Sequence, residues 1–226
     1  MVVIREVLCK SALSKSRIYG VDYSVNPYLG CQHSCSYCYA RFMLKYHRQG
    51  EEWGKFVDVK VNSSKALSNQ LSKTEPAPVL LSSVTDPYQP IEEKYELSRK
   101  ILEKLLTHNF PVSILTKSSL VLRDIDLLRR FGNCEVGLTV TTLSEDVRKC
   151  FEPFSSTIEE RLNALRVLHD EGVKTFAFLG PLLPLFVEDS LEGLAHKFRE
   201  VGVGAVLVDR LNIKYGNWKT IRESLE

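Results

Sequence analysis

The sequence predicts an α/β fold, a partial parallel β/α barrel of about six β/α units. Segments rich in β-branched residues alternate along the chain with segments whose apolar residues recur at helical spacing. Such alternation favours parallel strands that are joined by right-handed crossovers. A closed eight-unit barrel needs roughly 250 residues, whereas this chain has 226. The length therefore favours a barrel with fewer units in a single domain, 1–226.

The expected elements follow one another in a regular order. Strands are expected at residues 24–29, 56–61, 79–84, 111–116, 135–141, 174–180 and 205–208. Helices are expected at residues 39–47, 63–71, 92–108, 124–131, 157–171 and 189–201. We expect residues 1–20 to form an arm outside a core of about 21–210, and residues 211–226 to form a polar tail or a short helix.

Local signals support several of these helices. Residues 157–160 read Thr-Ile-Glu-Glu, which is a capping box, and Gly172 follows the last expected turn of that helix. Asp124 is a candidate N-cap for the helix that ends before Gly132. The helix at 92–108 carries its apolar residues on one face, namely Leu97, Ile101, Leu102, Leu105 and Leu106.

The strand at 135–141 alternates in a way that bears on function. One side of it is apolar, with Val136, Leu138 and Val140. The other side is small and hydroxylic, with Gly137, Thr139 and Thr141. Side chains alternate between the two faces of a strand. The small face suits a barrel interior that holds a polar cofactor, and it equally suits a packed row of threonines.

Three cysteines stand close together at C-x3-C-x2-C spacing, namely Cys31, Cys35 and Cys38. A loop this tight directs three thiolates at one point. Four thiolates would complete a zinc site or the protein ligands of an iron–sulfur cluster, whereas three leave one iron of a cubane open to a substrate or cofactor. The spacing therefore favours a [4Fe–4S] cluster that takes part in chemistry.

Two other interpretations of the cysteines compete with the cluster. A zinc site would need a fourth ligand, such as His33 or a distant cysteine, but no second ligand pair follows the motif. Disulfides need an oxidising compartment, and the sequence has no secretion signal. The remaining cysteines, Cys9, Cys134 and Cys150, have no partner spacing and are expected to be small buried hydrophobes.

The composition is typical of a folded globular domain, and the net charge is small. Hydrophobic residues make up 44% of the chain, and the formal net charge is +2. This charge gives no support to a nucleic-acid partner, which stays open. No apolar run is long enough for a membrane span or a signal peptide. We therefore expect a cytoplasmic protein with no membrane partner, and we expect it to be a monomer.

The carboxyl ends of parallel strands are where a β/α barrel places its site. Polar residues follow the expected strands at these ends, namely Thr85, Asp86, Tyr88, Gln89, Lys117, Thr139, Thr141, Asp209 and Arg210. Surface loops are often polar in any barrel, so this placement alone does not separate a catalytic site from an ordinary rim. It does offer a cation for a carboxylate and hydroxyl groups for a ribose.

The segment from Asn26 to Arg41, Asn-Pro-Tyr-Leu-Gly-Cys-Gln-His-Ser-Cys-Ser-Tyr-Cys-Tyr-Ala-Arg, resembles the signature of radical S-adenosylmethionine (SAM) enzymes. It is most similar to the branch related to spore photoproduct lyase, with weaker matches from about Val21 to about Pro184. The resemblance implies an open six-unit barrel and a [4Fe–4S] cluster that binds SAM. It implies an electron donor of the flavodoxin or ferredoxin type. One electron then cleaves SAM to a 5′-deoxyadenosyl radical, which abstracts hydrogen from a substrate that the sequence does not identify.

The resemblance also suggests roles for residues outside the cysteines. Tyr37 matches the aromatic residue that packs on the adenine, and Lys117 matches a lysine that contacts the cofactor carboxylate. Thr139 stands where the family often has a serine near the cofactor. Glu152 and Arg161 resemble a Glu-Pro…Arg-Leu pattern and are further cofactor-site candidates, although a structural salt bridge explains them equally well.

The same resemblance assigns a catalytic role to two tyrosines. Tyr37 and Tyr39 match tyrosines that are implicated in hydrogen-atom return in spore photoproduct lyase. The lyase has a cysteine hydrogen donor that aligns with Ser82 and Ser83, and a DNA-binding extension that is not evident here. Three hypotheses stay open: a radical SAM enzyme with an unidentified substrate, a DNA photoproduct lyase-like repair enzyme, and a non-catalytic cluster- or zinc-binding protein.

Overall fold

The computed structural model describes residues 2–184, 186 and 190–226. Its main sheet runs in the order β10–β9–β8–β7–β6–β3–β2. The strands are β2 (Leu13–Lys15), β3 (Tyr23–Val25), β6 (Val79–Leu81), β7 (Val112–Thr116), β8 (Cys134–Thr139), β9 (Lys174–Leu182) and β10 (Ala205–Arg210). Neighbouring strands from β3 to β10 pair in parallel, whereas β2 pairs with β3 in the antiparallel sense. The expected α/β fold with a partial β/α barrel is confirmed.

A second, smaller sheet was not expected from the sequence. It has the order β1–β5–β4 and consists of β1 (Val3–Val7), β5 (Phe56–Lys60) and β4 (Tyr28–Leu29). The strand expected at 56–61 therefore lies outside the barrel, and the arm of residues 1–20 contributes strands to both sheets. The strand expected at 24–29 divides into β3 and β4 at Asn26 and Pro27. Pro27 has no N–H for a ladder, and the Asn26 side chain accepts hydrogen bonds from the loop after β6.

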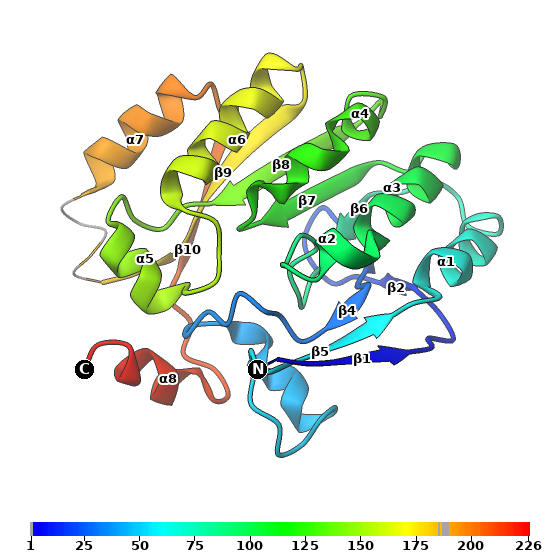
Figure 1. Ribbon diagram of the computed structural model, residues 1–226. Helices are drawn as coiled ribbons and strands as arrows, with labels where there is room; N and C mark the ends of the chain where they lie inside the picture. The colour runs from blue at the N-terminus through cyan, green and yellow to red at the C-terminus, as the bar shows by residue number, and fades with distance from the viewer. Residues whose placement is uncertain (1, 185, 187–189) are drawn as a thin grey trace.

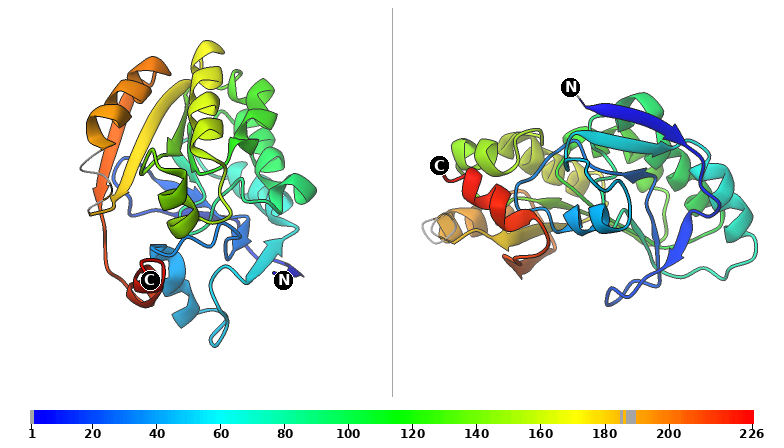
Figure 2. Two further views of the ribbon diagram at one scale, coloured as in Figure 1. Left: turned by 60° about the vertical axis from the view of Figure 1, so that its left-hand side comes forward. Right: turned by 90° about the horizontal axis from the view of Figure 1, so that it is seen from below.

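Helices α3, α4, α6 and α7 lie together on one face of the main sheet (Figures 1 and 2), and the other helices are placed around it. The α-helices are α1 (Ser63–Leu71), α2 (Glu92–Tyr95), α3 (Leu97–Thr107), α4 (Ile125–Leu128), α5 (Glu145–Phe151), α6 (Ile158–Asp170), α7 (Leu191–Glu200) and α8 (Asn217–Glu223). Two 3-10 helices complete the set, η1 (Tyr39–Lys45) and η2 (Ser119–Asp124). The helix expected at 39–47 is thus a 3-10 helix, and the one expected at 124–131 is reduced to the short α4, which directly follows η2. Asp124 stands at the N-cap position of α4, but its side chain makes no capping hydrogen bond because Arg99, Arg123 and Tyr88 bind it instead.

The long helix expected at 92–108 is interrupted at Glu96, which adopts a left-handed φ of 52°. The reason lies in Glu92. Its carboxylate oxygens accept hydrogen bonds from the Ser98 backbone N–H at 3.0 and 3.1 Å. A carboxylate that satisfies a free N–H at a helix start acts as a cap, so α3 begins anew after the break. By contrast, the expected capping box at Thr157 and Glu160 is present.

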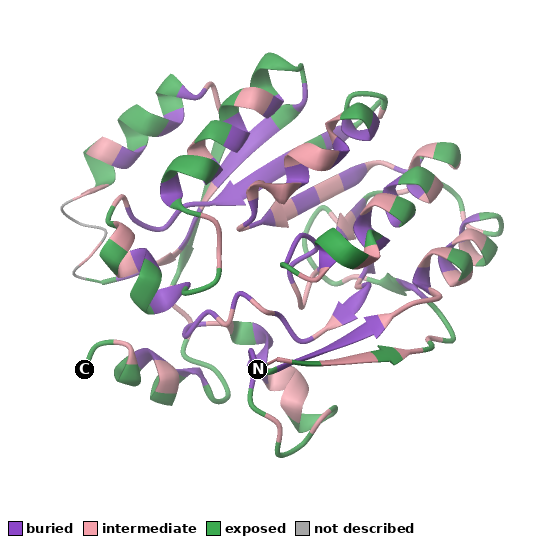
Figure 3. Ribbon diagram, in the orientation of Figure 1, coloured by how far each residue is buried: buried purple, intermediate pink, exposed green. Residues whose placement is uncertain are grey.

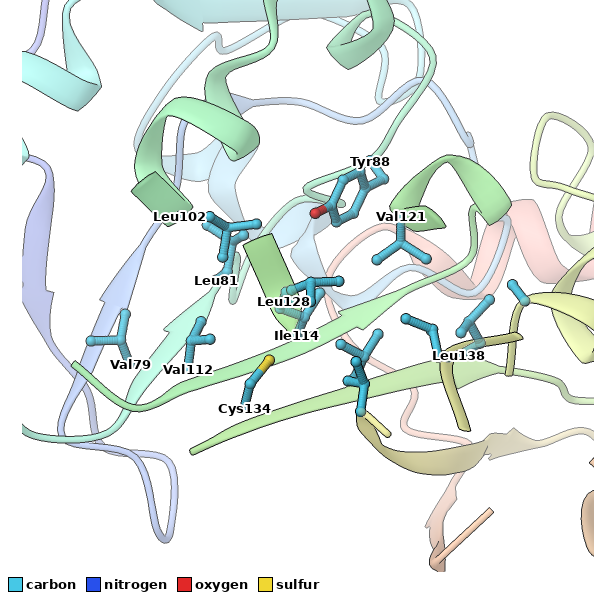
Figure 4. Close-up of a cluster of buried hydrophobic side chains, with 14 of the residues drawn as sticks. Val79, Leu81, Tyr88, Leu102, Val112, Ile114, Val121, Leu128, Cys134 and Leu138 are labelled. Atoms are coloured by element: carbon cyan, nitrogen blue, oxygen red, sulfur yellow. The ribbon is translucent and has the colours of Figure 1, made fainter. Parts of the chain in front are cut away.

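The core lies between the sheet and these helices. Figure 4 shows side chains of β6, β7 and β8 meeting those of α3, α4 and the loop that carries Tyr88. Val136, Leu138 and Val140 are fully buried there, as their alternation indicated. Buried residues concentrate in the sheet, and the outer faces of the helices are exposed (Figure 3). Among the described residues, no helix is both long and apolar enough to cross a lipid bilayer.

The last helix, α8, packs beside η1 and the cysteine loop, as both views in Figure 2 show. Of the two forms expected for residues 211–226, a polar tail or a short helix, the structure has the short helix, and it contacts the cysteine loop. In the helix expected at 189–201, α7 begins at Leu191, and Asp189 lies outside the described residues. Of the three isolated cysteines, Cys134 is buried as expected, whereas Cys150 is exposed and Cys9 is half-buried.

Candidate functional site

A cavity of about 360 Å³ opens at the carboxyl ends of the parallel strands. Cys31, Cys35 and Cys38 line it, together with residues at or after the carboxyl ends of β6, β7, β8, β9 and β10, residues of η1, and Trp53. In Figure 1 the arrowheads of β7 and β8 point towards the part of the molecule that holds η1 and α8. The parallel sheet thus brings the cysteine loop and the strand ends together, where barrels place their sites.

The three thiols are shielded from solvent. Cys31 is 8% exposed, Cys35 is 7% exposed, and Cys38 is half-buried. Burial raises the pKa of all three thiols, that of Cys35 to about 12. Among the described residues, no three His, Cys, Asp or Glu side chains converge closely enough to hold one metal ion.

The loop after β6 fixes the start of the cysteine loop. The Thr85 hydroxyl donates to the Gly30 carbonyl oxygen at 2.6 Å. The buried Gln89 side chain donates to the same carbonyl at 3.3 Å and accepts from the Gln32 backbone N–H at 2.9 Å. Gly30 has a φ of +90°, and an added Cβ would lie 2.3 Å from the Phe56 carbonyl oxygen. Cys31 is therefore held from both sides.

The other end of the cysteine loop is held by the C-terminal helix. The Thr220 hydroxyl donates to the Ser36 carbonyl oxygen at 2.6 Å, and the Asn217 side chain donates to the Tyr37 carbonyl oxygen at 3.1 Å. Asn217 is fully buried. The Arg41 guanidinium adds a bond to the Cys35 carbonyl oxygen at 3.2 Å. Backbone carbonyls that no strand or helix satisfies thus find partners on α8 and η1.

His33 lies in the cysteine loop with both ring nitrogens facing protein oxygens. Nδ1 is 2.9 Å from the Phe154 carbonyl oxygen, and Nε2 is 3.4 Å from Asp86 Oδ2. Asp86 also accepts from the Thr116 hydroxyl and the Lys117 backbone N–H. Burial would raise the pKa of Asp86, but His33, the Thr116 hydroxyl and the Tyr88 backbone N–H lower it to about 2. In this arrangement His33 anchors the loop to the strand ends.

Lys117, Thr139 and Tyr37 come together in the cavity, although they are far apart in the sequence. Lys117 Nζ lies 3.4 Å from Thr139 Oγ1 and 5.6 Å from the centroid of the Tyr37 ring. All three residues line the cavity that the cysteines share. Gly137 lies on the same face of β8, and the Phe176 ring fills the space that a side chain at this position would need. This face of β8 therefore borders the cavity at Thr139 and the Phe176 ring at Gly137.

These features are those of a known family. The sequence matches the Radical SAM superfamily profile over residues 25–198. The chain belongs to the radical SAM superfamily. This family uses a [4Fe–4S] cluster and SAM, and its enzymes need an electron donor.

Sequence relatives agree with this assignment. The chain is 41% identical to an uncharacterized protein of Methanocaldococcus jannaschii, over 82% of this chain and 70% of that protein. It is 24% identical to a protein of Pseudomonas phage M6 named radical SAM Nalpha-GlyT isomerase, over 84% of this chain and 39% of that protein. The phage protein thus has a large part with no counterpart in this chain.

The fold resembles solved radical SAM structures. A spore photoproduct lyase with bound AdoMet and dinucleoside spore photoproduct superposes with a TM-score of 0.75 at 18% identity. The superposition covers 98% of this chain, and the chain spans 66% of the lyase. At this identity the likeness concerns the fold, and it confirms the partial barrel expected from the sequence.

The residues of the cavity fit the two groups that radical SAM proteins use. Cys31, Cys35 and Cys38 would hold the cluster, since all three line this cavity and the other cysteines of the chain do not. The cavity volume lies within the usual range of about 300–1,000 Å³ for small-molecule sites. The Lys117 ammonium and the Thr139 hydroxyl offer polar contacts for a charged ligand.

Glu152 and Arg161 lie behind the cavity wall of this radical SAM domain. Arg161 Nη1 is 2.5 Å from Glu152 Oε2, and the Tyr37 hydroxyl donates to the other carboxylate oxygen. Arg161 also donates to the Thr139 carbonyl oxygen at 2.9 Å. Burial would raise the pKa of Glu152, but Arg161, Lys117 and the Tyr37 hydroxyl lower it. The salt bridge expected as one alternative is thus present, and neither residue lines the cavity. The pair contacts Tyr37 and Thr139 from behind, and a role of the pair towards the cofactor stays a prediction.

Tyr39 lies at the edge of the radical SAM cavity. Its side chain is 47% exposed, and its hydroxyl donates to the Ser83 carbonyl oxygen. Ser82 and Ser83 line the cavity as well. Ser82 and Ser83 thus face the cavity, with Tyr39 beside them.

Sequence reasoning missed two parts of the site. Trp53 lies in the cavity wall and is 2% exposed, and its neighbour Gly54, with a φ of +92°, was the available signal. The contacts from Asn217 and Thr220 have no local signal at all, because they join residues 180 and 184 positions apart.

Proposed function

We propose that this chain is a radical SAM enzyme in which Cys31, Cys35 and Cys38 hold the [4Fe–4S] cluster. When both groups are bound, one electron cleaves SAM to a 5′-deoxyadenosyl radical, which abstracts a hydrogen atom from the substrate. We take the electron donor to be of the flavodoxin or ferredoxin type. The observation that carries the proposal is that the three cysteines and Lys117 line the same cavity at the carboxyl ends of the strands.

Lys117 is the residue that we assign to the cofactor carboxylate. Its ammonium contacts the Thr139 hydroxyl and the Tyr37 ring, neither of which carries a negative charge. A carboxylate brought into this cavity would therefore gain a charge-assisted hydrogen bond. Thr139 offers a hydroxyl beside the same position, and the Tyr37 ring offers an apolar surface for an adenine.

Glu152 and Arg161 act in this proposal through the residues they hold. Glu152 fixes the Tyr37 hydroxyl, and Arg161 fixes the backbone of Thr139. Tyr37 and Tyr39 are the candidates for returning a hydrogen atom at the end of the reaction. Tyr39 is the more accessible of the two, since it is 47% exposed whereas Tyr37 is 7% exposed.

The test is anaerobic reconstitution followed by chemical reduction. The wild-type protein should bind four irons and four sulfides per chain and should convert added SAM to 5′-deoxyadenosine, which liquid chromatography detects. Iron without 5′-deoxyadenosine would favour a non-catalytic cluster protein. One zinc per chain, retained in place of iron, would contradict the proposal.

A nucleic-acid substrate is the second candidate, and the mouth of the cavity is what favours it. Arg210 and Lys214 line the cavity, and Lys45 Nζ lies 4.6 Å above the Tyr215 ring, which is 49% exposed. Exposed rings among cations can stack bases and pair with phosphates. Binding of labelled single-stranded DNA that falls steeply as salt rises would support this candidate. Binding that is absent at low salt would remove it.

A further inference from the structure

Trp53 lies against the cysteine loop, in a segment that leads into β5. Its side chain packs with Cys31 and Ala40 in one buried cluster. Cys38, which is partly buried, packs against this cluster. The Phe56 ring meets the indole edge-on, with centroids 6.3 Å apart and planes at 89°. Next to it, an added Cβ on Gly54 would lie 2.1 Å from Ser34 Oγ, so this segment is pressed onto the cysteine loop. The orientation of the indole is therefore fixed.

The indole N–H of Trp53 has no hydrogen-bond partner of adequate geometry among the described residues, although Nε1 is buried. Indole nitrogen only donates, and a buried donor without an acceptor destabilises a fold. Cys38 packs against the buried cluster that holds the indole, and both residues line the cavity. The Cys38 sulfur is therefore an acceptor next to this N–H.

We propose that the Trp53 indole N–H donates a hydrogen bond to the Cys38 thiolate of the assembled [4Fe–4S] cluster and thereby raises the reduction potential of that cluster. The inference rests on the proposed function, because it takes Cys38 to be a cluster ligand. It assigns a role to a residue outside the cysteine motif.

The physical reason lies in the charge that reduction adds. The cluster gains one electron from the donor, so the negative charge on its sulfurs increases. A fixed N–H dipole stabilises the more negative state more than the less negative state. Hydrogen bonds to the sulfurs are one of the means by which a protein sets the potential of an iron–sulfur cluster. Removal of the N–H should therefore make the cluster harder to reduce.

The test uses the two tryptophans of the chain, Trp53 and Trp218. Trp53→Phe removes the N–H and keeps an aromatic ring, whereas Trp218→Phe alters a side chain that is 57% exposed. Both variants and the wild type are reconstituted anaerobically, their iron and sulfide are counted, and the midpoint potential is measured by EPR-monitored redox titration. We expect Trp53→Phe to keep its iron and to show a more negative midpoint than the wild type. Trp218→Phe should match the wild type.

A second variant covers the case in which Trp53→Phe loses its iron because the smaller ring leaves a gap. Benzothienylalanine keeps the bicyclic shape of tryptophan and replaces N–H by sulfur. Incorporated in the Trp218→Phe background, it substitutes Trp53 alone. A more negative midpoint in that protein supports the inference, and an unchanged midpoint overturns it.

The outcomes also separate this inference from the function on which it rests. A wild-type protein that assembles no cluster overturns the proposed function together with the role of Trp53. A cluster that assembles fully in every variant, with one common midpoint and one common EPR spectrum, overturns the role of Trp53 alone.

Discussion

Arg161 and Glu152 form an ion pair in which each side chain is only 1% exposed. The same Glu152 carboxylate accepts a hydrogen bond from the Tyr37 hydroxyl, so a pair outside the cavity sets the position of a ring inside it. Charges this deeply buried are costly to separate, because the partner that remains has neither water nor a counter-ion.

The first prediction concerns this pair. Arg161→Met should lower the free energy of unfolding of the cluster-free protein by about 3–5 kcal/mol, because it leaves the Glu152 carboxylate buried and uncompensated. Urea unfolding followed by circular dichroism measures the change. The control is Arg129→Met, which breaks the exposed pair with Glu171 and should cost at most about 1 kcal/mol. Similar losses in both variants would contradict the prediction.

The second prediction concerns the cluster ligands. Alanine at Cys31, Cys35 or Cys38 should abolish the cluster after anaerobic reconstitution, since each removes one of three thiolates. Iron and sulfide content and the EPR spectrum of the reduced protein provide the measurement. The matched control is a triple variant with alanine at Cys9, Cys134 and Cys150, which should keep a full cluster. Loss of iron from this triple variant would refute the assignment of the ligands.

The third prediction concerns Lys117. A charge-assisted hydrogen bond contributes about 1.5–3 kcal/mol, so Lys117→Ala should weaken SAM binding by roughly 10- to 100-fold. Anaerobic calorimetric titration of the reconstituted protein measures the affinity. Lys174→Ala is the control, because that exposed lysine begins β9 at the opposite end of the sheet. An unchanged affinity in Lys117→Ala would exclude its contact with the cofactor and leave Thr139 as the better candidate.

The fourth prediction concerns Gln89, whose side chain hydrogen-bonds to the backbone of Gly30 and of Gln32, the residues before and after Cys31. Gln89→Glu keeps the volume but loses the donor to the Gly30 carbonyl oxygen. The altered loop should therefore release iron to a chelator several-fold faster. Gln70→Glu is the matched control, since Gln70 makes a similar set of backbone bonds to Ala12 and Leu13 away from the cavity. Equal iron release from the two variants would contradict the prediction, because it would show that both substitutions act by destabilising the fold as a whole.

Much of the barrel could be predicted because its signals are local. Apolar runs and capping residues lie within single elements, and the parallel order then brings Cys31, Lys117 and Thr139 to the same ends of the strands. The break at Glu96 could not be predicted in this way. It depends on a carboxylate at Glu92 that also accepts from the distant Tyr28 hydroxyl, so the helical pattern of the sequence continues where the helix itself stops.

The smaller sheet and the contacts of α8 could not be predicted either, because they too depend on partners far away in the sequence. The alternation at 56–61 predicts a strand but not its partners, and β5 pairs with β1 and β4 through backbone groups that carry no sequence information. The polar residues of 211–226 look like a tail. Their contacts with the cysteine loop come from Asn217 and Thr220, whose side chains are equally common on free surfaces.

The attachment of α8 to the cysteine loop also orders events during synthesis. The Ser36 and Tyr37 carbonyls leave the ribosome long before their partners, which are made 184 and 180 residues later. Until then the cysteine loop is held only by contacts from earlier parts of the chain, at Gly30, at His33, at the Ser36 backbone N–H and along η1. The two carbonyls between Cys35 and Cys38 therefore gain their last hydrogen-bond partners only when α8 has been made.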